Sequence, residues 1–278
     1  MKLSGAARLA GVLGHPVKHS LSPRLHGHWL ERYGLDGAYL PLNVAPDDLA
    51  DVVKALPRMG FSGANVTVPH KEAVIALCDR LDETARRIGA VNTLVFGEDG
   101  IEGRNTDAFG FYENIRVDLE ARSTAPEKAL VLGAGGAARA VVFALAQNGF
   151  STILIANRTR DKAERLSGEI AGEAIAWDEA EQAASGCDLL VNTTVLGMTG
   201  KAPLSFHLDD LPKSALVTDI VYAPLKTDLL NRASDRGHPI VDGLGMLLHQ
   251  ARPGFQAWFG TDPKVDEDLR QSVLGAGA

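Results

Sequence analysis

The chain has 278 residues, of which 45% are hydrophobic and 23% are charged, and its formal net charge is −7. This length suits one large or two modest globular domains, and the acidic balance argues against nucleic acid or an anionic membrane as the main partner. Cys78 and Cys187 lie too far apart in the sequence to suggest a disulfide framework or a zinc site, and no apolar run reaches about 18 residues. We therefore expect a cytoplasmic protein without a signal peptide or membrane span.

Short apolar runs alternate with longer amphipathic stretches, which is typical of an α/β protein with mostly parallel strands. In the first part of the chain the pattern predicts strands at 9–13, 38–44, 63–66 and 92–96, with helices at 23–33, 46–56, 71–78 and 82–88. Residues 96–101 predict a hairpin turn. A long helix is expected from 107 to 122, before a short Ser-Thr-Ala-Pro linker.

A second unit begins after this linker with the buried strand Lys128-Ala-Leu-Val-Leu-Gly133. Further strands are predicted at 152–156, 173–177, 188–192 and 216–221, with helices between them. The sequence thus predicts two domains: an N-terminal α/β substrate domain at 1–106 and a Rossmann-type dinucleotide-binding domain at 107–244. The apolar helical segment at about 245–278 is expected to pack back on the first domain.

A glycine-rich turn joins the first strand of the second unit to a helix. Gly133, Gly135 and Ala138 match G-x-G-x-x-[G/A], in which the glycines allow a close backbone approach to a pyrophosphate and the small third residue lets the helix pack on the strand. The helix N-terminus offers free N–H groups to the phosphates. A purely structural turn is the alternative, but the position between a strand and a helix favours a dinucleotide site.

The next strand ends in Asn157-Arg158-Thr159. An NAD enzyme usually places an acidic residue at this strand end, where it binds the ribose 2′-hydroxyl. Here a guanidinium takes that place, and it can clamp a 2′-phosphate with Thr159 as a further donor and Lys162 as a further charge. The sequence therefore favours NADP as the cofactor, and a solvated arginine at a helix start is the alternative.

Three polar stretches of the first domain follow predicted strand ends, where open α/β sheets bind ligands. The first carries the hydroxyls of Ser20 and Ser22, which suit a carboxylate. The second carries an amide, a hydroxyl and an ammonium group in residues 63–71, and the third carries an amide and a carboxylate in residues 90–107. These residues are candidate ligands of a small anionic substrate.

Structural roles compete with these assignments. Ser22-Pro23 suits an N-cap and a first-turn proline, Asp107 suits a plain N-cap, and Lys71 suits a solvated lysine at a helix start. A positive charge at that helix start opposes the helix dipole, which makes the purely structural role of Lys71 less attractive. The histidines at 15, 19, 26 and 28 lack the compact spacing of metal ligands, so no metal site is predicted.

In order and spacing, these motifs resemble the shikimate dehydrogenase family over nearly the whole chain. The matching segments are His19-Ser-Leu-Ser-Pro23, Asn65-Val-Thr-Val-Pro-His-Lys71, Gly89-Ala-Val-Asn-Thr93, Asn105-Thr-Asp107, Gly133-Ala-Gly-Gly-Ala-Ala138, Asn157-Arg-Thr159, Asn192-Thr-Thr-Val-Leu-Gly-Met198, Asp219-Ile-Val-Tyr222 and Gly243-Leu-Gly-Met-Leu-Leu-His-Gln250. One departure is Gly27, which follows His26 where the family usually has Asn. No substrate role is assigned to that position.

The resemblance implies a two-domain enzyme whose substrate and NADP face each other across a cleft, and which reversibly reduces 3-dehydroshikimate to shikimate in aromatic amino acid biosynthesis. The implied catalytic pair is Lys71, as proton donor or oxyanion stabiliser, and Asp107, which orients it. The implied substrate ligands are Ser20, Ser22, Asn65, Thr67, Asn92, Asp107, Tyr222 and Gln250. The implied cofactor ligands are Gly133, Ala134, Gly135, Gly136, Ala137, Asn157, Arg158, Thr159, Lys162, Thr193, Gly243 and Met246.

Three alternatives stay open at this point. A relative could prefer quinate or NAD, and only kinetics with both substrates and both cofactors would distinguish it. A non-catalytic NADP sensor should lack a complete acid–base pair, whereas Lys71 and Asp107 are both present. An enzyme acting on an amino analogue is the third alternative. In each case we expect a small-molecule ligand, no nucleic acid or membrane partner, and a monomer or homodimer.

Overall fold

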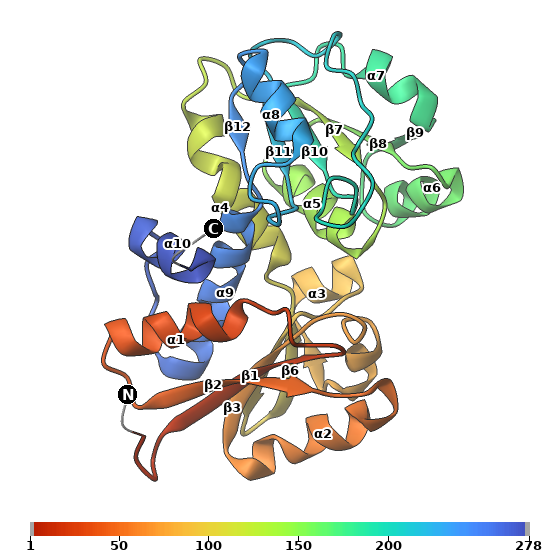
Figure 1. Cartoon of the computed structure of the whole chain (residues 1–278). Coiled ribbons are helices and arrows are strands. Elements are labelled where there is room, and N and C mark those ends of the chain that lie inside the picture. The colour runs from red at the N-terminus through yellow and green to blue at the C-terminus, as the bar shows by residue number, and fades with distance from the viewer. Residues whose placement is uncertain (1–2, 276–278) are drawn as a thin grey trace. The chain divides into compact units, whose positions relative to one another are not determined.

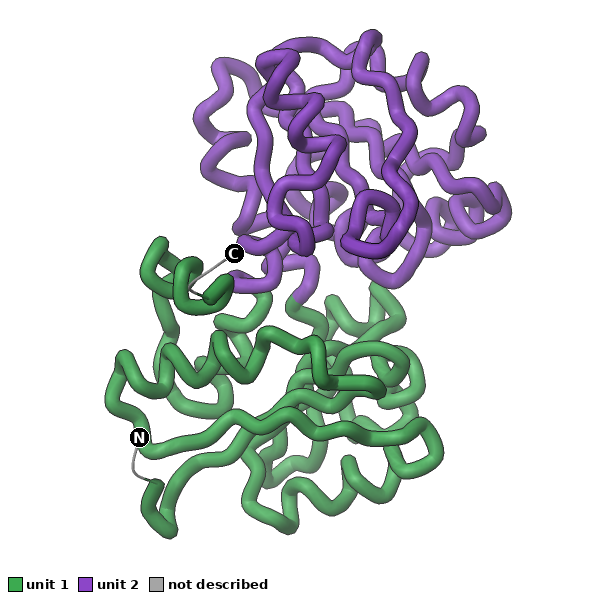
Figure 2. The backbone as a smooth tube through the Cα atoms, viewed as in Figure 1, with its two compact units in different colours: residues 1–106, 250–278 green, residues 107–249 purple. Residues whose placement is uncertain are grey.

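The computed structural model describes residues 3–275. The chain divides into two compact units, of which unit 1 holds residues 1–106 and 250–278 and unit 2 holds residues 107–249 (Figure 2). The chain leaves unit 1 after Thr106 and returns to it at Gln250, within helix α9 (Leu244–Phe259). The sequence-based boundary near 106 falls at the first crossing, whereas the return lies inside this helix rather than before it.

Unit 1 is built on a six-stranded sheet in the order β2-β1-β3-β5-β6-β4 (Figure 1). Strand β1 runs parallel to β2 and β3, whereas β3 pairs antiparallel with β5, which forms a hairpin with β6. Strand β5 is thus antiparallel to both of its neighbours, whereas β6 and β4 pair in parallel, so the sheet is mixed. The elements are β1 Arg8–Gly14, α1 Ser22–Arg32, β2 Gly37–Asn43, η1 Pro46–Asp48, α2 Leu49–Ala55, η2 Pro57–Met59, β3 Phe61–Val66, η3 Ala73–Leu77, β4 Arg80–Leu81, α3 Glu83–Ile88, β5 Thr93–Gly97 and β6 Gly100–Arg104.

The C-terminal segment packs back on unit 1, as the sequence predicts. Helix α10 (Glu267–Leu274) lies against α1, and the Arg24 guanidinium donates to the Val273 carbonyl at 2.8 Å. Trp29, fully buried on α1, donates from its indole nitrogen to the Lys264 carbonyl at 3.0 Å. The apolar face of α1 is therefore covered by the end of the chain.

Unit 2 contains a parallel six-stranded sheet in the order β12-β11-β10-β7-β8-β9. Read from the β9 edge, this is the doubly wound dinucleotide-binding order, in which the strand order reverses between β7 and β10. The Rossmann-type fold expected for this half is confirmed. The elements are α4 Asp107–Glu120, β7 Lys128–Leu132, α5 Gly136–Gln147, β8 Thr152–Ala156, α6 Arg160–Glu169, β9 Glu173–Ile175, η4 Trp177–Glu179, α7 Ala180–Ala183, β10 Leu189–Asn192, β11 Leu216–Asp219, α8 Asp228–Asp235 and β12 Ile240–Val241.

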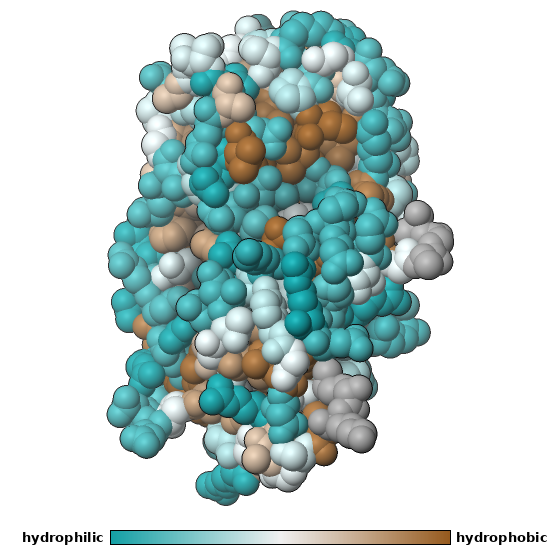
Figure 3. Space-filling model, turned by 90° about the vertical axis from the view of Figure 1, so that its left-hand side faces the viewer, coloured by the Kyte–Doolittle hydropathy of each residue, from teal (hydrophilic) through white to brown (hydrophobic). Residues whose placement is uncertain are grey.

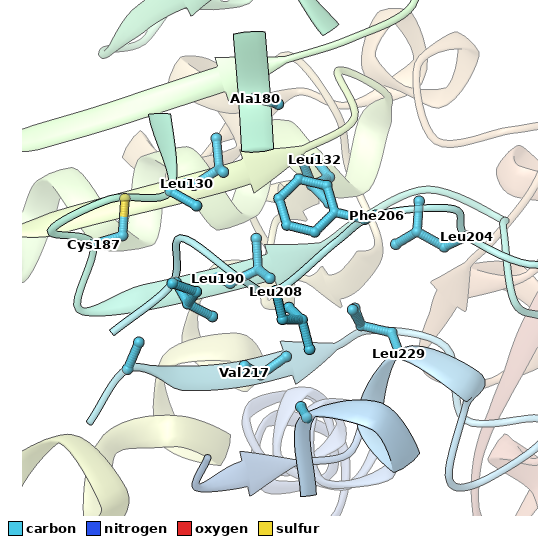
Figure 4. Close-up of a cluster of buried hydrophobic side chains, with 14 of the residues drawn as sticks. Leu130, Leu132, Ala180, Cys187, Leu190, Leu204, Phe206, Leu208, Val217 and Leu229 are labelled. Atoms are coloured by element: carbon cyan, nitrogen blue, oxygen red, sulfur yellow. The ribbon is translucent and has the colours of Figure 1, made fainter. Parts of the chain in front are cut away.

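An apolar cluster fixes the strands of unit 2 to the chain that crosses one face of the sheet. Leu132, Leu190 and Val217 come from three adjacent strands, and Phe206 and Leu208 come from the segment before β11 (Figure 4). All five side chains are at least 97% buried. The buried sheet holds its strand ends in fixed positions, which is what a ligand site at those ends requires.

Several element boundaries differ from the sequence-based expectation, including those of η3, β9 and α1. Residues 73–77 form a five-residue 3-10 helix rather than a helix over 71–78, because Cys78 bonds back to the Ile75 carbonyl and is extended. Strand β9 ends at Ile175, so Trp177 opens the 3-10 turn η4. Helix α1 is capped by Leu21 without a side-chain bond, so Ser22 is its first residue and not its N-cap.

Hydrophobic side chains on the face drawn in Figure 3 form separate areas among hydrophilic ones. Within residues 3–275, no helix combines the length and the apolar character that crossing a membrane requires.

Candidate active site

A pocket of about 280 Å³ lies in unit 2, where β7, β8 and β10 end. In an open parallel sheet, ligands bind beyond the carboxyl ends of the strands at the point where the strand order reverses. The lining residues are Gly133, Ala134, Gly135, Asn157, Arg158, Thr159, Lys162, Trp177, Thr193, Thr194, Val195 and Leu196. The pocket thus gathers eight of the predicted cofactor ligands.

The glycine turn of this pocket fits a pyrophosphate. Gly133 has φ +110°, and a Cβ there would lie 2.6 Å from the Thr193 hydroxyl oxygen, so only glycine fits this turn. Cβ atoms at Gly135 and Gly136 would meet nothing within 4 Å, which leaves open space at the start of α5. The first turn of this 12-residue helix carries free backbone N–H groups that can bind phosphate oxygens.

The cationic part of the pocket follows β8. Ala156 ends that strand, and Asn157 folds back so that its amide donates to the Thr159 carbonyl at 2.8 Å. This local bond shapes the turn that carries Arg158, whose side chain is exposed. Lys162 lies on the next helix and lines the same pocket. Two cationic side chains in one pocket suit a phosphate monoester, as expected for NADP.

A hydrogen-bonded scaffold supports the opposite wall. The Thr193 hydroxyl donates to the Leu132 carbonyl at 2.7 Å, which ties β10 to β7. The Asn192 side chain accepts from Thr194 and donates to the buried Asp219 carboxylate at 3.0 Å. Burial raises the pKa of Asp219, and donors from Val221, Asn192 and Thr227 partly offset that rise.

Five predicted ligands within residues 133–246 do not line this pocket. Gly136 and Ala137 lie in the first turn of α5, Gly243 directly precedes α9, and Met246 lies in its first turn. A Cβ at Gly243 would lie 2.4 Å from the Ile220 carbonyl oxygen, which gives that glycine a packing reason of its own. Tyr222 follows β11, and burial raises its pKa.

A continuous row of polar side chains runs through unit 1. The Tyr39 hydroxyl donates to the Asn65 Oδ1 at 2.6 Å. The Asn65 amide donates to the Asn92 carbonyl at 3.1 Å and to the Thr93 hydroxyl at 3.2 Å. Asn65 is the penultimate residue of β3 and Thr93 is the first residue of β5, so the row crosses between these two antiparallel strands in the middle of the sheet.

The row continues from Asn92 to the returning helix α9. The Asn92 amide donates to the Thr106 hydroxyl at 3.0 Å and to the Gln250 Oε1 at 3.3 Å, and its Oδ1 accepts from the Thr106 backbone at 2.9 Å. These three residues are at least 91% buried. Amides and hydroxyls that both donate and accept are suited to the hydroxyl groups of a small polar molecule.

Two buried aromatic groups support the other end of the row. Burial raises the pKa of Tyr39 well above its usual value, which keeps its hydroxyl protonated, and a hydrogen bond with Ser22 opposes this rise. The His26 ring stacks on Tyr39 at 3.9 Å between centroids. Burial lowers the pKa of His26 to about 3, although the nearby Asn65 amide raises it slightly. His26 is therefore neutral and holds Tyr39 in place.

The loops after β1 and β3 are joined by backbone bonds. Thr67 donates to the Leu13 carbonyl at 2.9 Å, and His15 donates to the Val68 carbonyl at 3.1 Å. A Cβ at Gly14 would lie 2.6 Å from the Thr67 methyl carbon, so glycine lets the two strand ends close. In the first loop, the Ser20 hydroxyl accepts from the Ser22 backbone at 3.3 Å. The structure thus brings the two serines and Thr67 to one edge of the sheet.

Lys71 and Asp107 flank the central part of the row along the chain. The Lys71 carbonyl accepts from the Val91 backbone at 2.8 Å, which fixes Lys71 beside the residue that precedes Asn92. Asp107 directly follows Thr106 and is the first residue of α4. Both side chains are partly exposed. Within residues 3–275, no cluster of three or more His, Cys, Asp or Glu side chains could hold a metal ion.

Comparison with known proteins identifies the family. Three family models match: the shikimate dehydrogenase substrate binding domain at residues 12–94, shikimate/quinate 5-dehydrogenase at 117–197 and the shikimate 5′-dehydrogenase C-terminal domain at 243–271. Shikimate dehydrogenase (NADP(+)) of Paramagnetospirillum magneticum is 62% identical over 98% of this chain and 100% of its own length. The chain belongs to the shikimate dehydrogenase family.

Solved structures of related enzymes share the fold. Shikimate 5-dehydrogenase of Thermus thermophilus, in complex with NADP(H) and shikimate, is 38% identical with a TM-score of 0.85, and the match covers 96% of this chain and 98% of that one. Quinate dehydrogenase of Corynebacterium glutamicum, in complex with NAD, is 30% identical with a TM-score of 0.89, covering 96% and 99%. Backbone similarity alone therefore does not separate these two substrates and cofactors.

The structure adds residues to the site that the family motifs did not single out. Tyr39, Thr93 and Thr106 complete the polar row of unit 1. Tyr39 lies within β2, and from the sequence alone an aromatic residue in a strand cannot be told from a core residue. Thr93 and Thr106 belong to the family motifs, but neither of them was assigned a role from the sequence. Their hydrogen bonds to Asn65 and Asn92 place them in the row. In unit 2, Trp177 joins the pocket from a strand end that the sequence predicted two residues too long.

Proposed function

We propose that this chain is an NADP-dependent shikimate dehydrogenase, which reversibly reduces the C3 ketone of 3-dehydroshikimate to the hydroxyl of shikimate. The observation that carries the proposal is the buried row of amides and hydroxyls that links Tyr39, Asn65, Asn92 and Gln250 in unit 1. A buried polar row is stable only when its groups are paired, and its amides and hydroxyls, which both donate and accept, are also suited to a ligand that offers several hydroxyls.

Shikimate carries one carboxylate and three hydroxyls on a six-membered ring, and the candidate ligands match this set. Ser20 and Ser22 donate to the carboxylate, and a hydrogen bond to a charged group is worth more than one to a neutral group. Asn65, Thr67 and Asn92 bind the ring hydroxyls, together with Asp107, Tyr222 and Gln250.

The pocket of unit 2 binds the cofactor. The turn at Gly133–Gly136 and the first turn of α5 bind the pyrophosphate, and Arg158, Thr159 and Lys162 bind the 2′-phosphate. Thr193 forms the wall at the strand-order reversal, with Gly243 and Met246 as further ligands. The cofactor, when bound, would supply the hydride chemistry, and the residues of this pocket supply position and charge.

Lys71 and Asp107 carry out the proton transfer that accompanies reduction of the ketone. When the ketone is reduced, its oxygen gains negative charge, and the Lys71 ammonium group stabilises that charge and donates its proton to the oxygen. Asp107 hydrogen-bonds the neighbouring hydroxyl and Lys71, which orients both groups. In the reverse direction Lys71, as a neutral amine, accepts the hydroxyl proton. We place the enzyme in the cytoplasm, as a monomer or homodimer without nucleic-acid or membrane partners.

The proposal is tested by incubating the purified protein with shikimate and NADP+, following the absorbance of reduced cofactor, and identifying the product by chromatography. We expect stoichiometric formation of 3-dehydroshikimate and NADPH. The proposal fails if shikimate is not oxidised with NADP+ while another substrate of the same class, such as quinate, is.

A further inference from the structure

Trp177 is the one aromatic side chain among the described residues that line the pocket of unit 2. The family motifs assign it no role, and it lies in the 3-10 turn η4 directly after β9. The strand register explains why it reaches the pocket. Ala156 of β8 pairs with Ile175 of the neighbouring parallel strand β9. Arg158 and Trp177 each lie two residues after this pair. Both therefore project from the same edge of the sheet.

The Trp177 ring is supported from behind. Together with Leu196, it packs against the buried apolar cluster of unit 2, while both residues also line the pocket. Trp177 is half-buried, in contrast to Trp29 and Trp258, which are at least 99% buried in unit 1. A ring held by the core on one side and facing a pocket on the other is suited to stacking a flat ligand group.

We propose that Trp177 forms the stacking surface for the purine base of the cofactor, an inference that rests on the proposed function. The purine is attached to C1′ of the ribose and the 2′-phosphate to the adjacent C2′. If Arg158 and Lys162 hold that phosphate, the base leaves the sugar within reach of the same pocket wall. Trp177 is the aromatic group available on that wall. It thus fixes the base while the cations select the phosphate.

The test is calorimetric binding of adenosine 2′,5′-bisphosphate, which carries the base and the 2′-phosphate but no nicotinamide. We expect Trp177→Ala to weaken binding about 10-fold or more, because base–aromatic stacking is lost. Trp177→Phe should restore binding to within about 3-fold, since a flat ring remains. Asp178→Ala changes the exposed neighbour in the same turn and should leave affinity unchanged.

A fluorescence titration with the same bisphosphate gives an independent reading that does not depend on the alanine variant. Binding should quench tryptophan emission in the wild-type protein, and Trp177→Phe should lose the quenching while keeping the affinity. The inference is overturned if the wild type and Trp177→Ala bind equally well, or if quenching persists in Trp177→Phe. Failure of the wild type to bind the bisphosphate would overturn the proposed function as well, so the two failures are distinguishable.

Discussion

Arg158 is the side chain on which the choice between NADP and NAD depends in this account. It follows the strand end where an acid would bind a free ribose hydroxyl. We expect Arg158→Ala to raise KM for NADP+ by at least about 10-fold, because a charge-assisted bond to the phosphate is lost, while KM for NAD+ stays unchanged. Steady-state kinetics with both cofactors measure this, and equal losses would show that Arg158 does not bind the 2′-phosphate.

Lys71 is expected to act mainly in the transition state. General acid catalysis typically contributes 10²–10⁴-fold, so Lys71→Ala should lower kcat by at least about 10²-fold with little change in KM for shikimate. Lys54→Ala, an exposed lysine on α2, is the matched control and should keep the wild-type rate. A Lys71→Ala enzyme with normal kcat and a raised KM would make Lys71 a binding residue.

We expect Tyr39 to act by positioning Asn65, to which its hydroxyl donates. Tyr39→Phe removes the 2.6 Å bond and leaves a buried acceptor unpaired, which should cost roughly 1–3 kcal/mol of unfolding free energy. We also expect KM for shikimate to rise several-fold while KM for NADP+ is unchanged. Tyr33→Phe, which removes an exposed hydroxyl that accepts from the Lys264 backbone, is the control for a lost phenol group. If KM for shikimate is unchanged in Tyr39→Phe, the polar row does not contribute to substrate binding.

At the scale of elements, the turn between β7 and α5 is the most constrained part of the cofactor pocket. Gly133→Ala places a Cβ 2.6 Å from the Thr193 hydroxyl at a positive φ, so the turn must shift. We expect NADP+ affinity to fall by at least about 10-fold, with shikimate affinity unchanged. Gly149 also has a positive φ, but a Cβ there would meet nothing within 4 Å. Gly149→Ala therefore shows the effect of backbone strain without a steric clash. Calorimetry of the two variants decides whether this turn binds the cofactor.

The sequence predicted the elements well where local rules apply. The glycine turn, the strand that follows it and the long helix from 107 were predicted because turn chemistry and periodicity act over short distances. The row from Tyr39 to Gln250 was not, since its bonds join residues up to 158 positions apart. Trp177 was missed for another reason: β9 has three residues, too few for an alternating pattern to mark its end.

At the scale of the whole molecule, the two units follow from sequence, but the return crossing does not. A helix reads as one continuous apolar pattern, so nothing in 244–259 marks the point where α9 passes from unit 2 to unit 1. The sequence also did not predict that β5 runs antiparallel to β3 in the first sheet. Residues 96–101 predicted a turn, whereas the pairing of β5 with β3 depends on contacts about 30 residues apart.

Stability against acid gives a whole-molecule prediction. Burial lowers the pKa of His26 to about 3, below the unfolded value of 6.5, so the unfolded chain binds the proton more readily. Its contribution to stability is complete above pH 6.5 and is lost as the pH falls towards 3. At pH 4.5 this loss is roughly 2–3 kcal/mol. Urea unfolding at pH 7 and 4.5 should show a smaller drop for His26→Phe, and an equal drop would contradict the argument.

Selectivity for shikimate and NADP is expected to come from the polar row of unit 1 and the cationic pocket of unit 2. It is tested most directly by kcat/KM of the wild-type protein for the four combinations of shikimate or quinate with NADP+ or NAD+. We expect shikimate with NADP+ to exceed shikimate with NAD+ by at least about 10-fold, the value of one charge-assisted contact, and to exceed quinate with either cofactor. A preference for quinate, or equal rates with NAD+, would contradict it.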